Sequence, residues 1–362
     1  MIMSEKSKQH VESCRFCWMC HHICPIGNAT GQERCTARAR ALGISLVNRG
    51  AIELEEIMDN IYECCTCGAC VHDCTTGWDT VMFTKETRLH AALEGKTPEY
   101  IMTLVSNCLE TGNAYGKTEI CPTLNDAIKA HTEKKDTLLL LGVDAKFMAC
   151  KQALKAIKVL EKANVDFSVL ENEPASGAQL DFLISAANET KEQMIACAKV
   201  LDEYKTVVVY DPNDAKTIKQ IYKEYGVEFS ANVVTYTSFV AGLIKEGKLA
   251  TQNSGKQVVF QDPYQLSRDL EETEEAREII SAFANLDEML LNRTETVWAG
   301  NILMAQYMPE VINKVAARRI FNAESIGVKT IVTACVSEYV SLKAVEQNKV
   351  EILSIEDLIL GE

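Results

Sequence analysis

The stretch that decides the fold lies near the start of the chain and reads Cys14-Arg-Phe-Cys17-Trp-Met-Cys20-His-His-Ile-Cys24-Pro25. Its cysteines follow the spacing C-x2-C-x2-C-x3-C, and a proline comes next. A second run, Cys64-Cys65-Thr-Cys67-Gly-Ala-Cys70-Val-His-Asp-Cys74, repeats the spacing without the proline. Three closely spaced thiolates can wrap around one small metal cluster, and a fourth thiolate from elsewhere completes the set. The two runs therefore predict two [4Fe–4S] clusters.

The spacing also predicts which cysteines share a cluster. In two-cluster ferredoxins the last cysteine of each run ligates the other cluster. This exchange keeps the two clusters close together, as a short electron relay requires. The predicted ligands of the first cluster are Cys14, Cys17, Cys20 and Cys74, and those of the second are Cys24, Cys64, Cys67 and Cys70.

Other metal assignments explain less of this pattern. Zinc also binds C-x2-C pairs, but it uses two pairs per site and leaves the third and fourth cysteines of each run unexplained. Cys65 is out of register with the repeat and has no assigned role. We expect His21 and His22 to be exposed or hydrogen-bonded, because eight thiolates already fill both clusters.

The composition is ordinary for a soluble globular protein. Ten of the 15 cysteines fall between Cys14 and Cys74, which favours metal ligation over a disulfide scaffold. The net charge of −14 argues against nucleic acid as the main partner. The sequence shows neither a secretion signal nor a transmembrane segment. We therefore expect a cytoplasmic protein, or one held peripherally at a membrane through a partner.

Helices are expected between the two cysteine runs, where apolar residues recur at near-helical spacing. This pattern resembles the all-helical ferredoxin domain of succinate dehydrogenase iron–sulfur subunits and heterodisulfide reductases. Arg34, Arg38 and Arg40 are expected on a solvated helix face, with a partner-docking patch as the alternative. The aromatic residues expected to form an apolar shell around the clusters are Phe16, Trp18 and Trp78.

From about residue 136 onward, strand-like and helix-like segments alternate, which predicts parallel sheets with crossover helices. The expected helices are Ala149–Ala163, Lys191–Tyr204 and one from Pro309 through Ala323. The expected strands are Thr137–Val143, Thr206–Tyr210, Gln257–Gln261 and Lys329–Ala334, with Phe167–Leu170 and Leu180–Ile184 as further short candidates.

A second resemblance covers this part of the chain. Asp262-Pro-Tyr-Gln-Leu-Ser-Arg268 is similar to the D-P-C-x-x-x-R segment of the cysteine-rich C-C-G domain. That domain occurs in heterodisulfide reductases and in the iron–sulfur subunits of anaerobic glycerol-3-phosphate dehydrogenase and glycolate or lactate oxidase. Its remaining cysteine positions correspond here to Trp298-Ala299-Gly300 and Cys335-Val-Ser-Glu338. The spacing is kept, but only Cys335 remains of the five cysteines.

An earlier copy of the same pattern has lost every cysteine. Its positions hold Val143, Ala175-Ser176-Gly177 and Asp211-Pro-Asn-Asp214, and Asn113-Ala-Tyr-Gly116 is similar to the family's connector between the two halves. The resemblance implies a multidomain chain, with an all-α ferredoxin-type N-terminal domain followed by two α/β parallel-sheet pseudo-repeats. The expected boundaries are 1–100 for the ferredoxin domain, 101–135 for the connector, and 136–250 and 251–362 for the repeats.

The lost cysteines bear on function. Where they are intact, the family's C-C-G positions hold unusual clusters that split a disulfide, but the side chains here cannot hold such a cluster. Whether Cys335, Asp211, Asp214 or Glu338 binds another metal stays open. The five scattered cysteines are expected to be small, reduced residues, with no nearby partner for Cys121. No glycine-rich fingerprint indicates a bound nicotinamide or flavin.

The resemblance implies an electron-transfer subunit without a substrate site of its own. Its expected partner is an FAD-containing dehydrogenase acting on a 2-hydroxy acid, glycerol phosphate or polyol. The acceptor would be a quinone, a flavoprotein or a ferredoxin-type protein. One alternative is a catalytic heterodisulfide- or quinone-reducing subunit with an altered C-terminal site. The other is a non-catalytic redox-sensing or assembly protein.

Overall fold

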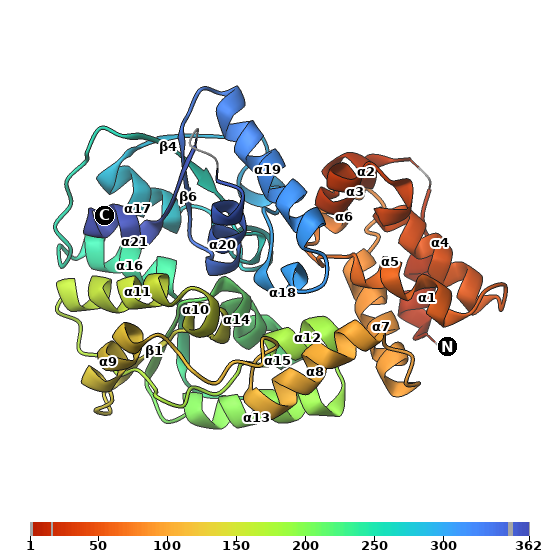
Figure 1. Ribbon diagram of the computed structural model, residues 1–362, viewed down its shortest axis with the longest axis horizontal. Helices are drawn as coiled ribbons and strands as arrows, with labels where there is room; N and C mark the ends of the chain where they lie inside the picture. Colours follow the sequence, from red (N-terminus) through yellow and green to blue (C-terminus); the bar gives the residue numbers. More distant parts are fainter. Residues whose placement is uncertain (1–2, 16, 347–349, 362) are drawn as a thin grey trace.

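A computed structural model describes residues 3–15, 17–346 and 350–361 (Figure 1). The segment that carries the cysteine runs is built from short helices joined by loops. These helices are α1 (Glu5–Glu12), α2 (Met19–Ile23), α3 (Pro25–Thr30), η1 (Glu33–Cys35), α4 (Ala37–Asn48), η2 (Leu54–Ile57), α5 (Met58–Tyr62), α6 (Ala69–His72), α7 (Thr80–Leu93), α8 (Glu99–Thr111) and α9 (Pro122–Ala130).

The first sheet has three parallel strands in the order β1-β2-β3. The strands are β1 (Thr137–Leu140), β2 (Thr206–Val209) and β3 (Asn232–Thr235), with Thr137 opposite Thr206 and Thr206 opposite Asn232. Crossover helices connect them, as parallel pairing requires. The helices of this half are α10 (Val143–Met148), α11 (Cys150–Lys162), α12 (Ala178–Ile184), α13 (Asn188–Leu201), α14 (Pro212–Lys216), η3 (Thr217–Ile221), α15 (Tyr222–Glu224) and α16 (Tyr236–Lys245).

The second sheet has four parallel strands in the order β5-β4-β6-β7. These are β4 (Gln257–Gln261), β5 (Asn285–Asp287), β6 (Thr330–Thr333) and β7 (Glu351–Ser354). The helices of this half are η4 (Gln265–Asp269), α17 (Glu275–Phe283), η5 (Arg293–Glu295), α18 (Ile302–Ala305), α19 (Pro309–Ser325), α20 (Val336–Ala344) and α21 (Ile355–Leu360).

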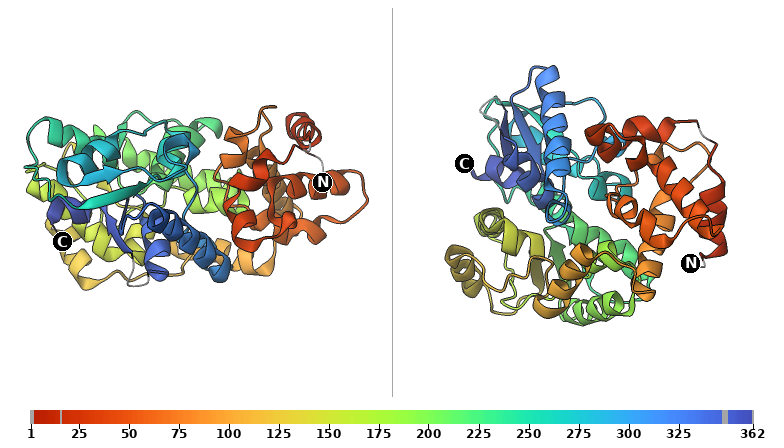
Figure 2. Two further views of the ribbon diagram at one scale, coloured as in Figure 1. Left: turned by 90° about the horizontal axis from the view of Figure 1, so that it is seen from above. Right: turned by 45° about the vertical axis from the view of Figure 1, so that its right-hand side comes forward.

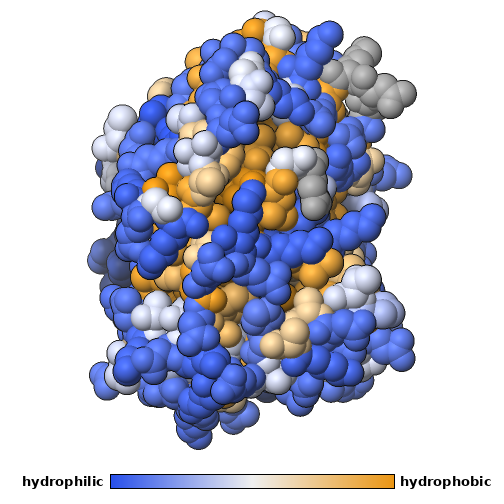
Figure 3. Space-filling model, turned by 90° about the vertical axis from the view of Figure 1, so that its left-hand side faces the viewer, coloured by the Kyte–Doolittle hydropathy of each residue, from blue (hydrophilic) through white to orange (hydrophobic). Residues whose placement is uncertain are grey.

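The two sheet-containing halves lie one above the other, and the cysteine-rich helices pack beside both (Figures 1 and 2). A single apolar core joins the halves, because Leu139 and Val208 of the first sheet belong to the same buried cluster as Val258 and Val332 of the second. Hydrophilic residues cover much of the face away from the cysteine-rich helices, with hydrophobic residues visible between them (Figure 3). Within the described residues, no helix combines the length and apolar character needed to cross a bilayer.

The expected fold class is wrong in its separate all-α N-terminal domain. Helix makes up about 56% of the chain, and the sheets are small. The cysteine-rich helices share one buried cluster with Leu180, Leu183 and Leu303 from the C-terminal part. Tyr62 also donates a hydrogen bond of 2.7 Å to the carbonyl of Leu183. The reason is physical, since the short helices cannot bury their apolar faces without these residues. The parallel α/β content is confirmed, whereas the domain boundaries stay a prediction.

The individual elements mostly follow the sequence pattern. Four expected strands form as β1, β2, β4 and β6, and the three expected helices form as α11, α13 and α19. Leu180–Ile184 is wrong as a strand, because it forms most of helix α12. Its short apolar run fits either structure, and packing against α7 and α8 selects the helix. Phe167–Leu170 contributes only an isolated bridge from Ser168 to Leu138.

One expectation about the scattered cysteines is also wrong. Cys121, at the start of α9, forms a disulfide with Cys150 at the start of α11, and their Cα atoms are 6.4 Å apart. The two residues are 29 positions apart in sequence, so only the packing of α9 against α11 brings them together.

Candidate iron–sulfur centres

The two cysteine loops have the same backbone design. In each loop the second cysteine precedes a residue in the left-handed region, Trp18 with φ of 69° and Gly68 with φ of 70°. A short helix starts at the next residue, and the third cysteine lies in its first turn. This conformation costs a non-glycine residue roughly 1–2 kcal/mol. The repeated spacing therefore folds into a repeated turn, even where the residue at the left-handed position is tryptophan.

Four predicted ligands, one from the first cysteine run and three from the second, line the same cavity. This small cavity lies between the two loops and is lined by all four of them, Cys24, Cys64, Cys67 and Cys70. Cys24 comes from the first run and the other three from the second, which is the crossed set that the spacing predicts. The four cysteines of the predicted second set therefore share one cavity.

Backbone and hydroxyl groups point toward these sulfur atoms. The Gly27 amide donates to Cys24 Sγ at 3.4 Å, and the Thr66 amide donates to Cys64 Sγ at the same distance. A hydrogen bond of 2.8 Å links Cys70 Sγ and Thr80 Oγ1. Hydrogen bonds to sulfur stabilise thiolates and tune the potential of a cluster that they hold.

Three arginines surround the same loop, and two of them, Arg40 and Arg88, are buried. Arg88 donates to the carbonyls of Cys64, Ile61 and Phe182, and Arg268 donates to the carbonyl of Cys67 at 3.1 Å. Arg40 is 2% exposed, donates to the carbonyl of Cys35, and interacts electrostatically with the thiols of the cavity. Buried cations require nearby negative charge. A cluster held by four thiolates carries that charge, so the site is built for an anion.

The thiols of this cavity differ in acidity. Burial raises the pKa of Cys24 to about 12 and raises that of Cys70 well above its usual value. A hydrogen bond with Cys65 and the charge of Arg268 lower the pKa of Cys67 to about 6, although burial opposes them. Iron binding displaces thiol protons. The donor set, the N–H···S bonds and the buried cations together fit an iron–sulfur cluster.

The first loop holds its thiols closer to the surface. Cys17 is exposed, while Cys14, Cys20 and Cys74 are partly buried, and these last three pack against the same apolar core. Burial raises the pKa of Cys20, and the nearby Cys14 and Cys17 add to that rise. Thr76 Oγ1 lies 3.2 Å from Cys74 Sγ. Cys14, Cys17 and Cys20 thus lie near one another at a more exposed site.

Some predicted neighbours of the clusters are found elsewhere. His21 and His22 are exposed, as expected, and lie within 3.4 Å of Glu33 and 3.5 Å of Asp73 respectively. Trp78 is buried, but Trp18 is 52% exposed and so does not form an apolar shell. Arg38 lies 3.8 Å over the Trp18 ring. Phe16 lies outside the described residues.

The structure places two arginines where the sequence did not predict them. Arg40 is wrong as part of a solvated face, because the end of its side chain turns inward to backbone carbonyls. No sequence signal distinguished Arg88, whose buried position depends on the packing of α7 against α12. Arg268 belonged to the D-P-C-x-x-x-R resemblance, and its contact with Cys67 gives that position a structural role.

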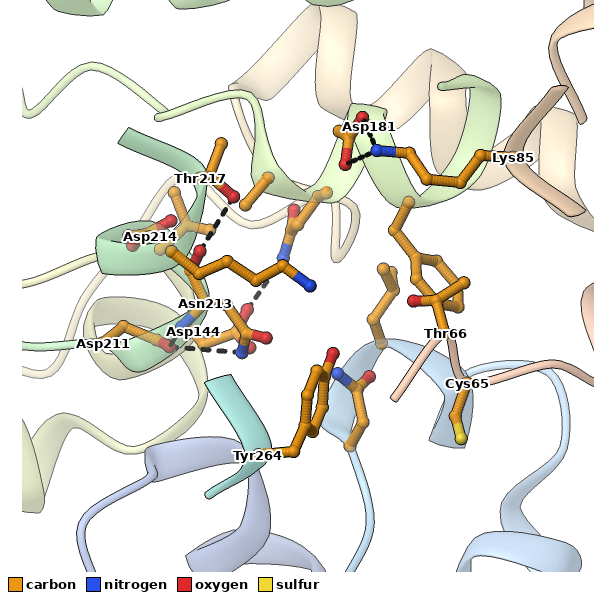
Figure 4. A pocket seen from close by; sticks show the side chains of 17 residues that line it. Cys65, Thr66, Lys85, Asp144, Asp181, Asp211, Asn213, Asp214, Thr217 and Tyr264 are labelled. Carbon is orange, nitrogen blue, oxygen red and sulfur yellow. Dashed lines mark hydrogen bonds and ion pairs between the residues drawn. The ribbon is translucent and has the colours of Figure 1, made fainter. Parts of the chain in front are cut away.

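The first set of C-C-G positions meets at a second, larger cavity (Figure 4). Val143, Asp211 and Asp214 line it, and Ser176 donates a hydrogen bond to Asp214. Gly142 has a φ of 86°, and a Cβ there would lie 2.3 Å from Asp214 Oδ2. The glycine therefore allows the carboxylate to approach the chain, and the lost cysteine positions surround open space.

The second set of C-C-G positions is filled by its own side chains. Glu338 is fully buried and accepts hydrogen bonds from the Ala299 amide at 3.0 Å and from Gln261 at 3.2 Å. Burial raises the pKa of Glu338 to about 8. Trp298 and Cys335 are each 2% exposed. This half therefore packs the former ligand positions into a closed polar and apolar network.

The distances between side chains show which residues could bind a further metal ion together. Within the described part of the chain, one group of His, Cys, Asp or Glu side chains is close enough to share a single ion. It consists of His72, Asp73 and Glu295 and lies at the surface. The residues left open by the sequence are not brought into such a group. These are Cys335, Asp211, Asp214 and Glu338.

Comparisons with known proteins point to iron–sulfur chemistry. No family model matches the chain. It is 28% identical over 273 residues to a "probable membrane-anchored ferredoxin" of Chromohalobacter salexigens, a match that covers 71% of this chain but only 39% of that protein. It is 23% identical to a dihydromethanophenazine:CoB–CoM heterodisulfide reductase subunit of Methanosarcina acetivorans, over 90% of this chain and 86% of that one.

Two further matches extend over nearly the whole chain. An uncharacterized iron–sulfur protein of Methanocaldococcus jannaschii is 24% identical, over 96% of this chain and 71% of its own length. A crystal structure of a hypothetical protein from Helicobacter pylori has a TM-score of 0.50 at 12% identity, covering 99% of this chain and 72% of that one, and it supports the fold alone. The chain is therefore a distant relative of iron–sulfur proteins that include one from a heterodisulfide reductase, and these relatives support an iron–sulfur cofactor.

Proposed function

We propose that this chain is an electron-transfer subunit that carries two [4Fe–4S] clusters. The proposed ligands are Cys14, Cys17, Cys20 and Cys74 for the first, and Cys24, Cys64, Cys67 and Cys70 for the second. The observation that carries the proposal is the cavity lined by the second set, with Arg40, Arg88 and Arg268 around its loop. When bound, such clusters accept and release single electrons.

The two loops would have different roles, because the residues around them differ in charge and in exposure to solvent. Arg40, Arg88 and Arg268 offset the negative charge that the buried site gains with each electron. The hydrogen bonds to Cys24 and Cys64 hold the sulfur atoms in place. The exposed first loop would meet the partner, because Cys17 and Trp18 are open to solvent. Electrons would then pass from the surface site to the buried one.

The partner that we propose is an FAD-containing dehydrogenase acting on a 2-hydroxy acid, glycerol phosphate or polyol. Relatives named as subunits of heterodisulfide reductase support assembly with other subunits. The acceptor would be a quinone, a flavoprotein or a ferredoxin-type protein. The location would be cytoplasmic, or peripheral to a membrane through the partner.

Iron analysis tests this proposal directly. Protein purified without oxygen should contain about eight irons and eight sulfides per chain and show paramagnetic signals on reduction. Replacing Cys17 or Cys67 with Ala should each remove about half of the iron, whereas Cys197→Ala should remove none, because Cys197 is buried in a separate core. Colourless protein, or protein with zinc in place of iron, would overturn the proposal.

A second measurement tests the electron transfer. A flavoprotein that co-purifies with the chain, once reduced by its substrate, should bleach the cluster absorbance of the holoprotein. Failure of every co-purifying flavoprotein to do so, with about eight irons present, would reject the dehydrogenase partner while leaving the clusters in place.

A further inference from the structure

The cavity at the first C-C-G positions lies directly beside the buried cysteine site. Both cavities are lined by Cys65 and Thr66, which form a wall between them. Figure 4 shows these two residues on one side of the larger cavity, facing Asp211, Asn213 and Tyr264 across it. A molecule in the larger cavity would therefore sit next to the residues that hold the buried cluster.

Polar groups inside this cavity lack partners. Tyr264 is 6% exposed, its hydroxyl points into the cavity (Figure 4), and it makes no hydrogen bond within the described residues. Asp211 and Asp214 are 2% and 6% exposed, and in the described structure Oδ2 of each receives no hydrogen bond. The side-chain amide of Asn301 also has a free N–H group there. None of these atoms is closed off from solvent in the described structure, so each is free to pair with water or with a ligand.

Apolar side chains make up part of the remaining wall. Phe182, Leu303 and Val143 line the cavity between the polar groups. Lys85 and Lys216 lie at its edge, but both are paired, with Asp181 at 2.8 Å and Asp269 at 2.7 Å. Both of these lysines are therefore neutralised by their partners, and the described lining residues do not favour an anionic ligand. The site therefore suits a neutral, flat molecule that accepts a hydrogen bond at one end and receives protons at the other.

We propose that this cavity binds a quinone-type acceptor, a conjugated ring with two carbonyl oxygens, and that the acceptor takes electrons from the buried cluster across the Cys65–Thr66 wall. This inference rests on the proposed electron-transfer function and names the site of its acceptor. Tyr264 donates a hydrogen bond to one carbonyl oxygen, and Asp211 and Asp214 face the other. Phe182 and Leu303 contact the ring.

The proposed reaction balances in electrons and protons, with the flavoprotein as the electron source. The quinone gains two electrons, delivered singly by way of the buried cluster from the flavoprotein, and two protons, which form two O–H bonds. No bond between heavy atoms breaks. Burial raises the pKa of Asp214 to about 7, and burial with the neighbouring Asp144 and Asp214 raises that of Asp211. Both carboxyls can therefore hold a proton to transfer, and solvent at the cavity mouth restores it.

Binding to the oxidised holoprotein tests the site without turnover. We would titrate anaerobically purified protein of known iron content with menadione in a calorimeter. One site per chain is expected. Tyr264→Phe should weaken binding about tenfold, because one hydrogen bond to the carbonyl is lost. Tyr204→Phe is the matched control, since Tyr204 is 8% exposed and lies in a separate core, and it should leave the affinity unchanged.

A second variant and a second readout protect the result against misfolding. Asp211→Asn combined with Asp214→Asn should slow re-oxidation of the reduced clusters by menadione, followed near 420 nm, by tenfold or more, with iron content retained. Menadione that fails to bind protein containing about eight irons, or that binds Tyr264→Phe as tightly as the parent, would overturn this inference and leave the proposed function standing. A low iron content would instead reject the proposed function.

Discussion

In the first cysteine loop Trp18 adopts the left-handed conformation at the surface, whereas in the second loop Gly68 adopts it beside thiols that are mostly buried. The backbone turn and the cysteine spacing are the same. Arg38 lies over Trp18 at the exposed loop, while three arginines, two of them buried, surround the other loop. One ligand pattern can therefore supply two electronic environments, because charge and solvent exposure are set by packing outside the motif.

The same contrast applies to the chain's two C-C-G-like halves. The first half leaves its former ligand positions open, next to the buried loop. The second half closes them around Glu338 and Trp298. Loss of the cysteines thus had different structural outcomes, and only the open positions can meet a small molecule.

The largest expected difference between the loops concerns stability. Cys67→Ala should lower the free energy of unfolding by at least about 3 kcal/mol, because buried arginines would lose the negative charge that balances them. Cys17→Ala should cost less than about 1 kcal/mol at its exposed site. Anaerobic denaturant unfolding would measure both, and equal losses would remove the contrast.

The next effect concerns the reduction potential of the buried site. Arg40→Met should make this potential more negative by about 60 mV, which corresponds to a tenfold change for one electron. The reduced site carries more negative charge, so losing a nearby cation disfavours reduction. A redox titration followed by electron paramagnetic resonance would measure the shift. Arg38→Met is the control at the exposed loop, and a larger shift there would assign the two signals the other way round.

Iron removal should separate the two sites in time. A mild chelator should first lower the iron content from about eight to about four per chain, because Cys17 is open to solvent and Cys67 is buried. The signal that survives should be the one sensitive to Arg40→Met. Simultaneous loss of both signals would mean that exposure does not control access to iron.

The smallest effects test the shared turn. Gly68→Ala should destabilise the protein by about 1–2 kcal/mol, because its φ of 70° strains any residue with a Cβ, even though the space is open. Trp18→Gly should change stability by less than about 1 kcal/mol, since relief of that strain offsets the lost contact with Arg38. Thermal unfolding of the two variants would compare them.

Patterns among neighbouring residues predicted the ligand sets and most of the strands. The spacing of the cysteines predicted two ligand sets, of which the second lines one cavity, and apolar runs anticipated β1, β2, β4 and β6. Both depend on residues close together in sequence. Strand β5, at the edge of its sheet, has only three residues and a mostly exposed surface, so it carried no comparable signal.

Contacts between distant segments could not be predicted in this way. The inward turn of Arg40, the packing of α12 against the cysteine-rich helices and the pairing of Cys121 with Cys150 all join separate parts of the chain. Their sequences would also suit other surroundings. The expected all-α domain was wrong for this reason, because its helices complete their core with residues from far along the chain, such as Leu183 and Leu303.

By itself, the sequence determined the kind of chemistry, since eight thiols at ferredoxin spacing favour iron over other metals wherever the loops lie. It also determined the alternation of strands and helices, which depends on local periodicity. Tertiary structure alone decided which loop is buried, which arginines balance its charge, and which former ligand positions stay open. Those properties depend on desolvation and on contacts between segments that no local pattern encodes.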